Sequence, residues 1–200
     1  MLLGLTLQAV VAMPGTGRVG EQACPPPDEI HVGEFSRDFV QTRHLQGLSA
    51  PIVSTGTVSL SGDRVVWHNL SPFDIRTTFG PEGVTQSVEG GEPQAINAYG
   101  SAGPLVGGLP LTDVLRGDLG KLETFFRVTT SIDAAGGRWT STLVPHDERL
   151  AEILGTIEVS GCTEVESITL RRPAGDYDVI RLSPSAGPAG DAAKAAGNAR

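Results

Sequence analysis

Polar and apolar residues alternate in three consecutive segments of the first half of the chain, at residues 52–60, 64–70 and 73–79. Alternation with a period of two is typical of strands that bury one face of a sheet and leave the other in water. The turns between these segments contain Gly62 and Pro72, and such short connections favour an antiparallel meander. One face of the third segment carries four residues with this spacing: Phe73, Ile75, Thr77 and Phe79.

The same kind of pattern returns after residue 124 and predicts further strands. They are expected at residues 125–130, 138–144, 156–160, 165–170 and 177–182. Together with the meander, these segments predict a mainly β (α+β) fold built on an antiparallel sheet.

A helix is expected before the first of these strands, over residues 29–45. Asp28 follows three prolines and can serve as its N-cap, because the side chain can accept a hydrogen bond from a backbone N–H of the first turn. Val32, Phe35 and Phe39 have the spacing of one helix face. We expect this helix to pack against the sheet.

A second helix is expected in the middle of the chain, at residues 111–122, where four apolar residues have helical spacing: Leu111, Val114, Leu115 and Leu119. Residues 90–110 before it are rich in glycine and irregular in pattern. A long loop that carries its own helix inside a β pattern is often functional, for instance as a lid. A third, shorter helix is expected at residues 145–154.

The N-terminal segment, residues 2–13, is apolar but too short to span the hydrocarbon core of a membrane. It fits the h-region of a secretory signal peptide, although no basic residue precedes it. A buried first strand is the alternative interpretation. With the signal peptide, the expected organisation is a signal peptide and linker at 1–23, one domain at 24–182 and a disordered tail at 183–200.

Residues 15–20 read GTGRVG and match the G-x-G-x-x-G pattern of dinucleotide-binding loops. In those proteins the pyrophosphate binds at the N-terminus of a helix that begins at the loop. Here the chain continues into Pro25, Pro26 and Pro27, through which no helix can propagate. We therefore expect no dinucleotide here and interpret the segment as a linker.

Composition narrows the possible function classes. The 200 residues include 26 glycines and 14 prolines, too many for a coiled coil or a helical bundle. The 23 acidic residues outnumber the 15 basic ones, and the formal net charge is −8. Binding of nucleic acid requires clustered lysines and arginines that neutralise phosphates, so no nucleic-acid partner is expected.

No motif in the chain indicates catalysis. Neither a G-x-S-x-G motif nor a P-loop occurs, and neighbouring carboxylates lie at predicted turns or alternate along strands, where solvated faces explain them. No metal-ligand spacing joins any of the four histidines to another histidine, a cysteine or an acid: His31, His44, His68 and His146. We therefore expect no catalytic residue, no metal and no cofactor.

The chain contains two cysteines, Cys24 ahead of the first predicted helix and Cys162 in a turn between two late strands. In an exported protein two cysteines favour a disulfide. A bridge between Cys24 and Cys162 would join the N-terminal segment to the sheet.

Five groups of residues, taken in order, resemble the motifs of LolA-type outer-membrane lipoprotein carriers, and the match is closer to divergent members than to the standard carrier. The resemblance extends over roughly residues 29–182. The matching residues are Phe39-Val40-Gln41 (F-x-Q), Ser54-Thr55-Gly56-Thr57-Val58 (S-x-G-x-L), Val65-Val66-Trp67 with Ser71-Pro72-Phe73 (L-x-W and a proline turn), Trp139-Thr140-Ser141-Thr142-Leu143-Val144-Pro145 (W-x-L-x-L-x-P), and Ile168-Thr169-Leu170 with Gly175-Asp176 (I-x-L and G-D).

The resemblance implies an incomplete, curved antiparallel β-barrel whose concave face is covered by helices. It also implies a monomeric periplasmic carrier, not an enzyme, that binds acyl chains of lipoproteins or related lipids in an apolar cavity and delivers them toward the outer membrane. The implied partners are a lipidated protein or lipid cargo, an inner-membrane donor transporter and an outer-membrane acceptor. The alternative is an enzyme on a similar barrel that acts on an apolar, polyketide- or glycolipid-like substrate.

By the same resemblance, cavity and lid residues are expected on two strands and on the central helix: Val65, Trp67, Phe73, Ile75, Phe79, Leu111, Val114 and Leu115. Ordinary core packing is the alternative role for each. In the standard carrier an Arg-Pro pair precedes the L-x-W strand, and its arginine is implicated in holding the lid closed. Residues 61–64 of this chain read Ser-Gly-Asp-Arg, so Arg64 is only an approximate substitute and that lid mechanism does not carry over directly.

Overall fold

The computed structural model describes residues 24–96, 111–134 and 137–184. The signal peptide and linker predicted at 1–23 lie outside the described residues, as does the predicted tail apart from Ser183 and Pro184. Within the described ranges, no helix is both long enough and apolar enough to span a membrane.

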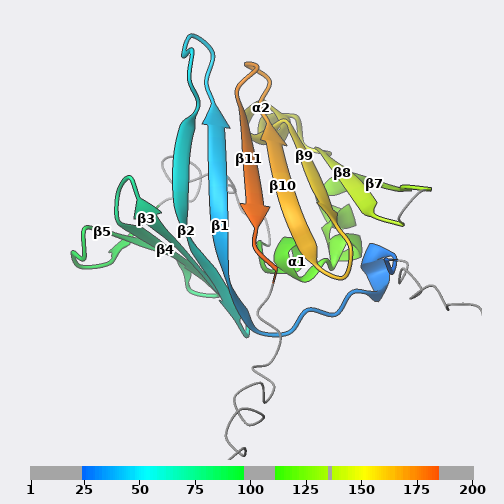
Figure 1. Cartoon of the computed structure of the whole chain (residues 1–200), viewed down its shortest axis with the longest axis horizontal. Coiled ribbons are helices and arrows are strands. Elements are labelled where there is room, and N and C mark those ends of the chain that lie inside the picture. Colours follow the sequence, from blue (N-terminus) through cyan, green and yellow to red (C-terminus); the bar gives the residue numbers. More distant parts are fainter. Residues whose placement is uncertain (1–23, 97–110, 135–136, 185–200) are drawn as a thin grey trace, which may run out of the picture.

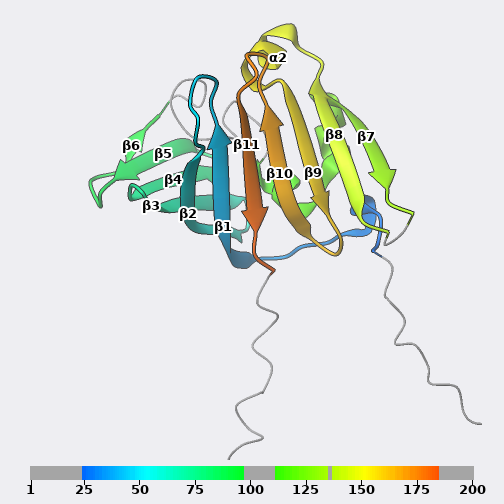
Figure 2. The same ribbon diagram turned by 45° about the horizontal axis from the view of Figure 1, so that its top comes forward.

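The described strands form one antiparallel sheet in the order β6-β5-β4-β3-β2-β1-β11-β10-β9-β8-β7. Their bounds are β1 (Phe35–His44), β2 (Ile52–Ser61), β3 (Arg64–Ser71), β4 (Ile75–Gly80), β5 (Gly83–Val88), β6 (Gln94–Ala95), β7 (Phe126–Ile132), β8 (Trp139–Pro145), β9 (Thr156–Gly161), β10 (Val165–Arg171) and β11 (Tyr177–Leu182). Figures 1 and 2 show that the sheet is strongly curved and that its edge strands, β6 and β7, do not meet. We call β2–β6 the first arm and β7–β10 the second arm.

In the described ranges, four helical segments accompany the sheet: η1 (Pro27–Glu29), α1 (Leu111–Arg116), η2 (Leu119–Thr124) and α2 (Glu148–Leu154), where η marks a 3-10 helix. Helix α1 lies on the concave side of the sheet, where it contacts β3 of the first arm and β10 of the second (Figure 1). The predicted fold, an incomplete curved antiparallel β-barrel with helices over its concave face, is confirmed.

Every strand predicted from alternation is present, as β2–β4 and β7–β11, with bounds that differ by at most two residues. The alternation did not predict β5 or β6, and β6 lies inside the segment expected to be irregular. The central helix predicted at 111–122 is present as two pieces, α1 and η2. They are separated at Gly117, whose φ of +81° does not continue a right-handed helix. The helix predicted at 145–154 is present as α2, which is capped by Asp147.

The helix predicted at residues 29–45 is wrong, because most of this segment is strand β1. Arg37, Phe39 and Gln41 are buried and the residues between them are exposed, which is the period of a strand. Two of these three buried residues are polar, so the apolar residues alone did not show the alternation. Phe35 and Phe39 are four positions apart, a spacing that fits one face of a helix and one face of a strand equally well.

The two ends of the described chain meet in the middle of the sheet, where β1 pairs with β11. Asp178 of β11 is fully buried opposite Arg43 of β1. Its Oδ1 atom accepts hydrogen bonds from Gln41 Nε2 (3.0 Å) and Arg43 Nε (2.7 Å), and its Oδ2 atom forms an ion pair with Arg172 Nη2 (2.7 Å). The buried carboxylate is therefore compensated by partners on both sides of the pairing.

Arg37 joins the same two strands near the opposite end of their pairing. Its side chain is buried and donates hydrogen bonds to the backbone oxygens of Ser183 and Val165, the latter at 2.7 Å, and it forms an ion pair with Glu164 (3.5 Å). Burial lowers the pKa of Arg37, and the carboxylates of Glu164 and Glu166 act in the opposite direction. This arginine holds the end of β11 and the start of β10 against β1.

Residues 24–34 cross beneath the helices before β1 begins, and we call them the strap (Figure 1). The disulfide expected between Cys24 and Cys162 is present and attaches the strap to the turn between β9 and β10. Ile30 of the strap is buried in the hydrophobic core, and η1 contacts η2. The strap therefore connects the second arm to the start of β1.

The backbones of β2 and β3 approach each other closely at Gly56, next to an irregularity in their register. A Cβ atom added at Gly56 would lie 1.9 Å from the carbonyl oxygen of His68, whereas one added at Gly80 of β4 would meet no atom within 4 Å. We expect Gly56→Ala to lower the free energy of unfolding by about 1–3 kcal/mol or more, because the strands must separate. Gly80→Ala is the control and should change it by about 0.5 kcal/mol or less. Urea unfolding of both variants measures the difference, and equal effects would contradict the close approach.

The contacts of Asp178 predict that its carboxylate is essential for the central pairing. Asp178→Ala leaves the half-buried Arg43 and Arg172 without their acceptor, and we expect a loss of about 3–5 kcal/mol in the free energy of unfolding. Asp178→Asn keeps one oxygen acceptor and should lose less. Denaturant unfolding of the wild type and both variants tests this order. Variants at least as stable as the wild type would show that burial of the carboxylate costs more than its partners compensate.

Candidate functional site

The concave face between α1 and β3 is the candidate binding site. Val65 and Trp67 point into it from β3 and are buried. Leu111, Val114 and Leu115 of α1 are buried in the same hydrophobic cluster. Five of the eight residues predicted for the cavity and lid thus lie together, on the two elements expected to carry them.

Two further predicted residues, Ile75 and Phe79, lie on β4 with their side chains on the concave face and are half-buried. Phe79 pairs with Val65 across the strands and packs against the core cluster. The eighth residue, Phe73, was expected to share this face, and that expectation is wrong. Phe73 is 63% exposed and precedes β4, because the turn that begins at Ser71-Pro72 extends through Asp74.

Polar residues also face the concave side of the first arm, and the sequence analysis did not predict them as site residues. Thr77 pairs with Trp67 across β3 and β4, and its Oγ1 atom accepts a hydrogen bond from Gln86 Nε2 of β5 (3.1 Å). Asn69 follows Trp67 on the same face of β3 and is half-buried. The alternation that placed Trp67 on this face places Asn69 there as well, so its position could have been found from the sequence.

The Phe39 ring contacts the Trp67 ring, with centroids 4.4 Å apart and planes tilted by 38°. Phe39 projects from β1, and a glycine, Gly56, lies beside it on β2 and opposite Asn69. Trp67 is thereby fixed between β1 and α1.

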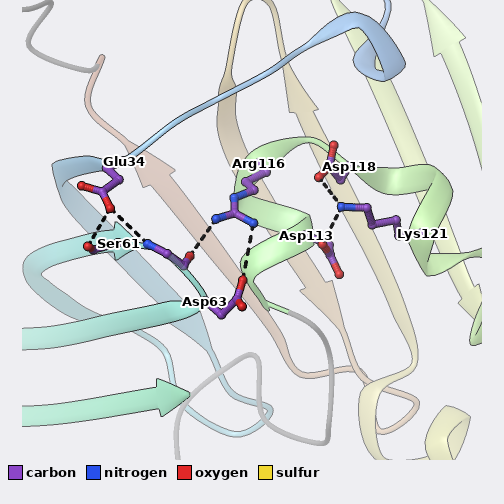
Figure 3. A network of polar contacts seen from close by, with 8 residues as sticks. Glu34, Ser61, Asp63, Asp113, Arg116, Asp118 and Lys121 are labelled. Carbon is purple, nitrogen blue, oxygen red and sulfur yellow. Dashed lines mark hydrogen bonds and ion pairs between the residues drawn. The ribbon is translucent and has the colours of Figure 1, made fainter. Parts of the chain in front are cut away.

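A group of polar contacts fastens α1 to the turn between β2 and β3, and we call it the clasp (Figure 3). Arg116 Nη2 of α1 donates a hydrogen bond to the carbonyl oxygen of Gly62 (2.7 Å), and Arg116 Nη1 lies 3.9 Å from Asp63 Oδ1. On the other side of the turn, Glu34 of the strap accepts hydrogen bonds from Ser61 Oγ (2.9 Å) and from the backbone N–H of Gly62 (3.2 Å). One turn of the sheet is therefore held by both the strap and α1.

The arginine that joins the turn to α1 is not the one expected from the resemblance. The expected residue was Arg64, at the start of β3, which was compared with the lid-holding arginine of the standard carrier. Arg64 is exposed, and the arginine that joins the turn to α1 is Arg116, which α1 itself carries. Its acceptor is a backbone carbonyl, so no pattern of side chains signals this contact.

Lys121 joins α1 to η2 at the surface. Its ammonium group lies 2.8 Å from Asp118 Oδ2 and 3.6 Å from Asp113 Oδ1 (Figure 3). The hydrogen bond and the charge of Asp118 raise the pKa of Lys121. The group is exposed, and such pairs contribute little to stability.

No three His, Cys, Asp or Glu side chains among the described residues form a group that could hold a metal ion. His68 and Asp74 do form a pair (2.7 Å), and Arg76 contacts the other nitrogen of the imidazole ring (3.2 Å). His68 alternates with Trp67 along β3 and therefore lies on the convex face, away from the candidate site.

No protein-family model and no curated protein sequence matches the chain. Among solved structures, the fold is similar to a LolA superfamily protein from Nitrosomonas europaea, with a TM-score of 0.45 and 9% identity over 80% of this chain and 89% of the other. It is also similar to a DUF1329 family protein from Desulfovibrio piger, with a TM-score of 0.37 and 10% identity over 82% of this chain and 89% of the other. The first belongs to the superfamily that the sequence motifs resemble. Both TM-scores are below 0.5, so neither likeness carries an argument about function.

The clasp predicts that Arg116 controls local opening of α1. Arg116→Ala removes its hydrogen bond to Gly62, which we expect to weaken the closed position of α1 by about 0.5–1.5 kcal/mol. Amide hydrogen exchange within α1 should then become about two- to twelvefold faster, with β9–β11 unchanged. Arg64→Ala removes an exposed arginine beside the same turn and is the matched control. Equal exchange rates in α1 of the wild type and Arg116→Ala would rule out the clasp.

Proposed function

We infer that the chain is a carrier that binds an acyl chain or a related apolar lipid on the concave face of the first arm, beneath α1. The observation that carries this proposal is the way in which α1 covers the sheet. Its apolar residues lie on the concave face between the two arms, but the helix has only six residues. A helix of this length is not stable on its own, so its position depends on packing against the sheet and on the clasp.

An apolar ligand can replace the packing that α1 provides. Transfer of an acyl chain from water to an apolar surface is favourable by about 0.8 kcal/mol for each CH₂ group. When α1 moves away, the apolar surfaces of Val65, Trp67 and Phe79 become available to such a chain. The ligand then contributes the contacts that the helix gives up, and closure of α1 after release restores a dry core.

The disulfide supports a location outside the cytoplasm, since disulfides persist in oxidising compartments. With the motif resemblance, it favours the periplasm and transfer of lipidated cargo from an inner-membrane donor to an outer-membrane acceptor. The net charge of −8 suits a protein that leaves anionic membranes after transfer. The absence of a charged residue among the predicted cavity residues fits binding rather than catalysis.

Lipid binding by the purified protein tests the proposal. Organic extraction followed by mass spectrometry should release a lipid, and delipidated protein should bind a fluorescent fatty acid at a ratio of about one to one. A protein that releases no lipid and binds no fatty acid would overturn the carrier function. Release of a chemically altered lipid would instead indicate the enzyme.

A variant of α1 links binding to the movement of the helix. Val114→Ala removes buried contacts between α1 and the sheet, so opening becomes easier and fatty-acid affinity should rise about fivefold, the factor that corresponds to about 1 kcal/mol. Ile153→Ala, at an exposed position of α2, is the control and should leave affinity unchanged. Unchanged or weaker binding by Val114→Ala would show that α1 does not compete with the ligand.

A further inference from the structure

Two polar atoms on the inner face of β3 are buried and have no hydrogen-bond partner within the part of the chain that the structure describes. They are the indole Nε1 of Trp67 and the amide Oδ1 of Asn69. Trp67 is only 5% exposed, so neither solvent nor a neighbour supplies an acceptor for its N–H group. A buried polar group without a partner lowers stability and usually has a specific explanation.

The neighbouring strands cannot supply the missing partners. Asn69 lies opposite Gly56 of β2 and Ile75 of β4, neither of which has a polar side chain. Trp67 lies opposite Val58 of β2 and Thr77 of β4, and the Thr77 hydroxyl hydrogen-bonds with Gln86 and not with the indole. On the side of β1, the ring of Phe39 covers the indole.

The other tryptophan of the chain shows that the fold can satisfy a buried indole. Trp139 of β8, in the second arm, is fully buried, and its Nε1 atom donates a hydrogen bond to the carbonyl oxygen of Cys162 (2.8 Å). Among the described residues, the other buried atoms without a hydrogen bond are Arg37 Nη2 and Asp178 Oδ2, and both side chains have other partners: Arg37 hydrogen-bonds to Val165, and Asp178 Oδ2 forms an ion pair with Arg172. The only polar atom of the Trp67 side chain is thus an unpaired donor, and the Asn69 oxygen is an unpaired acceptor. The two residues are two positions apart on β3, so both groups lie on the same face.

We propose that Trp67 and Asn69 bind the amide linkage of an N-acylated ligand, a proposal that rests on the carrier function above. The Trp67 N–H group donates to the acyl carbonyl, and the Asn69 oxygen accepts from the amide N–H. Alternate residues on one face of a strand lie about 6.6–6.8 Å apart. A secondary amide presents its carbonyl and its N–H on opposite sides, so it can hydrogen-bond to groups at both ends of such a spacing.

The same two groups discriminate against related ligands. An ester has the carbonyl but no N–H, so the Asn69 oxygen stays unpaired. A free fatty acid brings a carboxylate, whose burial beside one neutral donor is costly. The half-buried side chains of Ile75 and Phe79 on β4 provide apolar surface for the chain that extends from the linkage.

The test compares two ligands that differ only at the linkage: N-methylhexadecanamide and methyl hexadecanoate. Each displaces a fluorescent fatty acid from the full, delipidated chain, which gives its dissociation constant. We expect the wild type to bind the amide roughly tenfold more tightly than the ester, because the amide makes one additional hydrogen bond to a buried group. Asn69→Leu should bind both ligands equally, and Trp67→Phe should bind both more weakly than the wild type. Trp139→Phe is the matched control and should retain the tenfold preference.

A second measurement does not depend on affinity. The chain contains two tryptophans, so nuclear magnetic resonance of ¹⁵N-labelled protein resolves two indole N–H signals. Addition of the amide should shift the Trp67 signal downfield and leave that of Trp139 in place. In the absence of ligand, Asn69→Leu should be at least as stable to heat as the wild type, because it removes an unpaired polar group.

The outcomes separate this proposal from the carrier function. Binding of both ligands with equal affinity, with an unmoved Trp67 signal, would overturn the amide site and leave the carrier function intact. Binding of neither ligand, together with the absence of fatty-acid binding, would overturn both. If Asn69→Leu still prefers the amide, Asn69 does not bind the amide N–H group, and the proposal is also overturned.

Discussion

Strand β1 begins at Phe35 and β11 ends at Leu182, yet the two lie side by side at the centre of the sheet. Every other pairing in the sheet joins strands that follow one another along the chain. Without the pairing of β1 with β11, each arm would be a separate meander with one apolar face in water. The buried Asp178 and its arginine partners stabilise this pairing, which makes the two concave faces continuous and lets α1 contact both arms.

The polar side chains buried at the central pairing also explain which parts of the fold could be predicted from the sequence. In strands β2–β4 and β7–β11, apolar and polar residues largely alternate along the sequence, so the apolar residues alone were enough to predict these strands. Strand β1 buries Arg37 and Gln41 beside Phe39, because it must hold β11 through side-chain hydrogen bonds. Its apolar residues alone predict a helix. The hydrogen-bond partners that explain the buried polar residues lie on β10 and β11, more than 120 residues away in the sequence.

The residues of the candidate site could likewise be predicted from the sequence only in part. Val65, Trp67 and the apolar residues of α1 share faces that follow from local period, and the motif resemblance assigned those faces to the cavity and lid. The structure brings these residues together. Phe73 has the right period but lies ahead of the strand, since the turn after Pro72 is longer than the alternation suggests. The clasp depends on the backbone oxygen of Gly62, which carries no sequence signal.

Under the proposed carrier function, reversible binding requires that α1 be held more weakly than the rest of the structure. The strap is fixed by the disulfide at one end and by β1 at the other, and Glu34 holds the turn between β2 and β3. That turn therefore stays in place when α1 leaves it. On opening, α1 loses the contacts of Arg116 with Gly62 and Asp63 and the burial of three apolar side chains. An acyl chain can replace the burial but not the polar contacts, so these contacts favour closure after release.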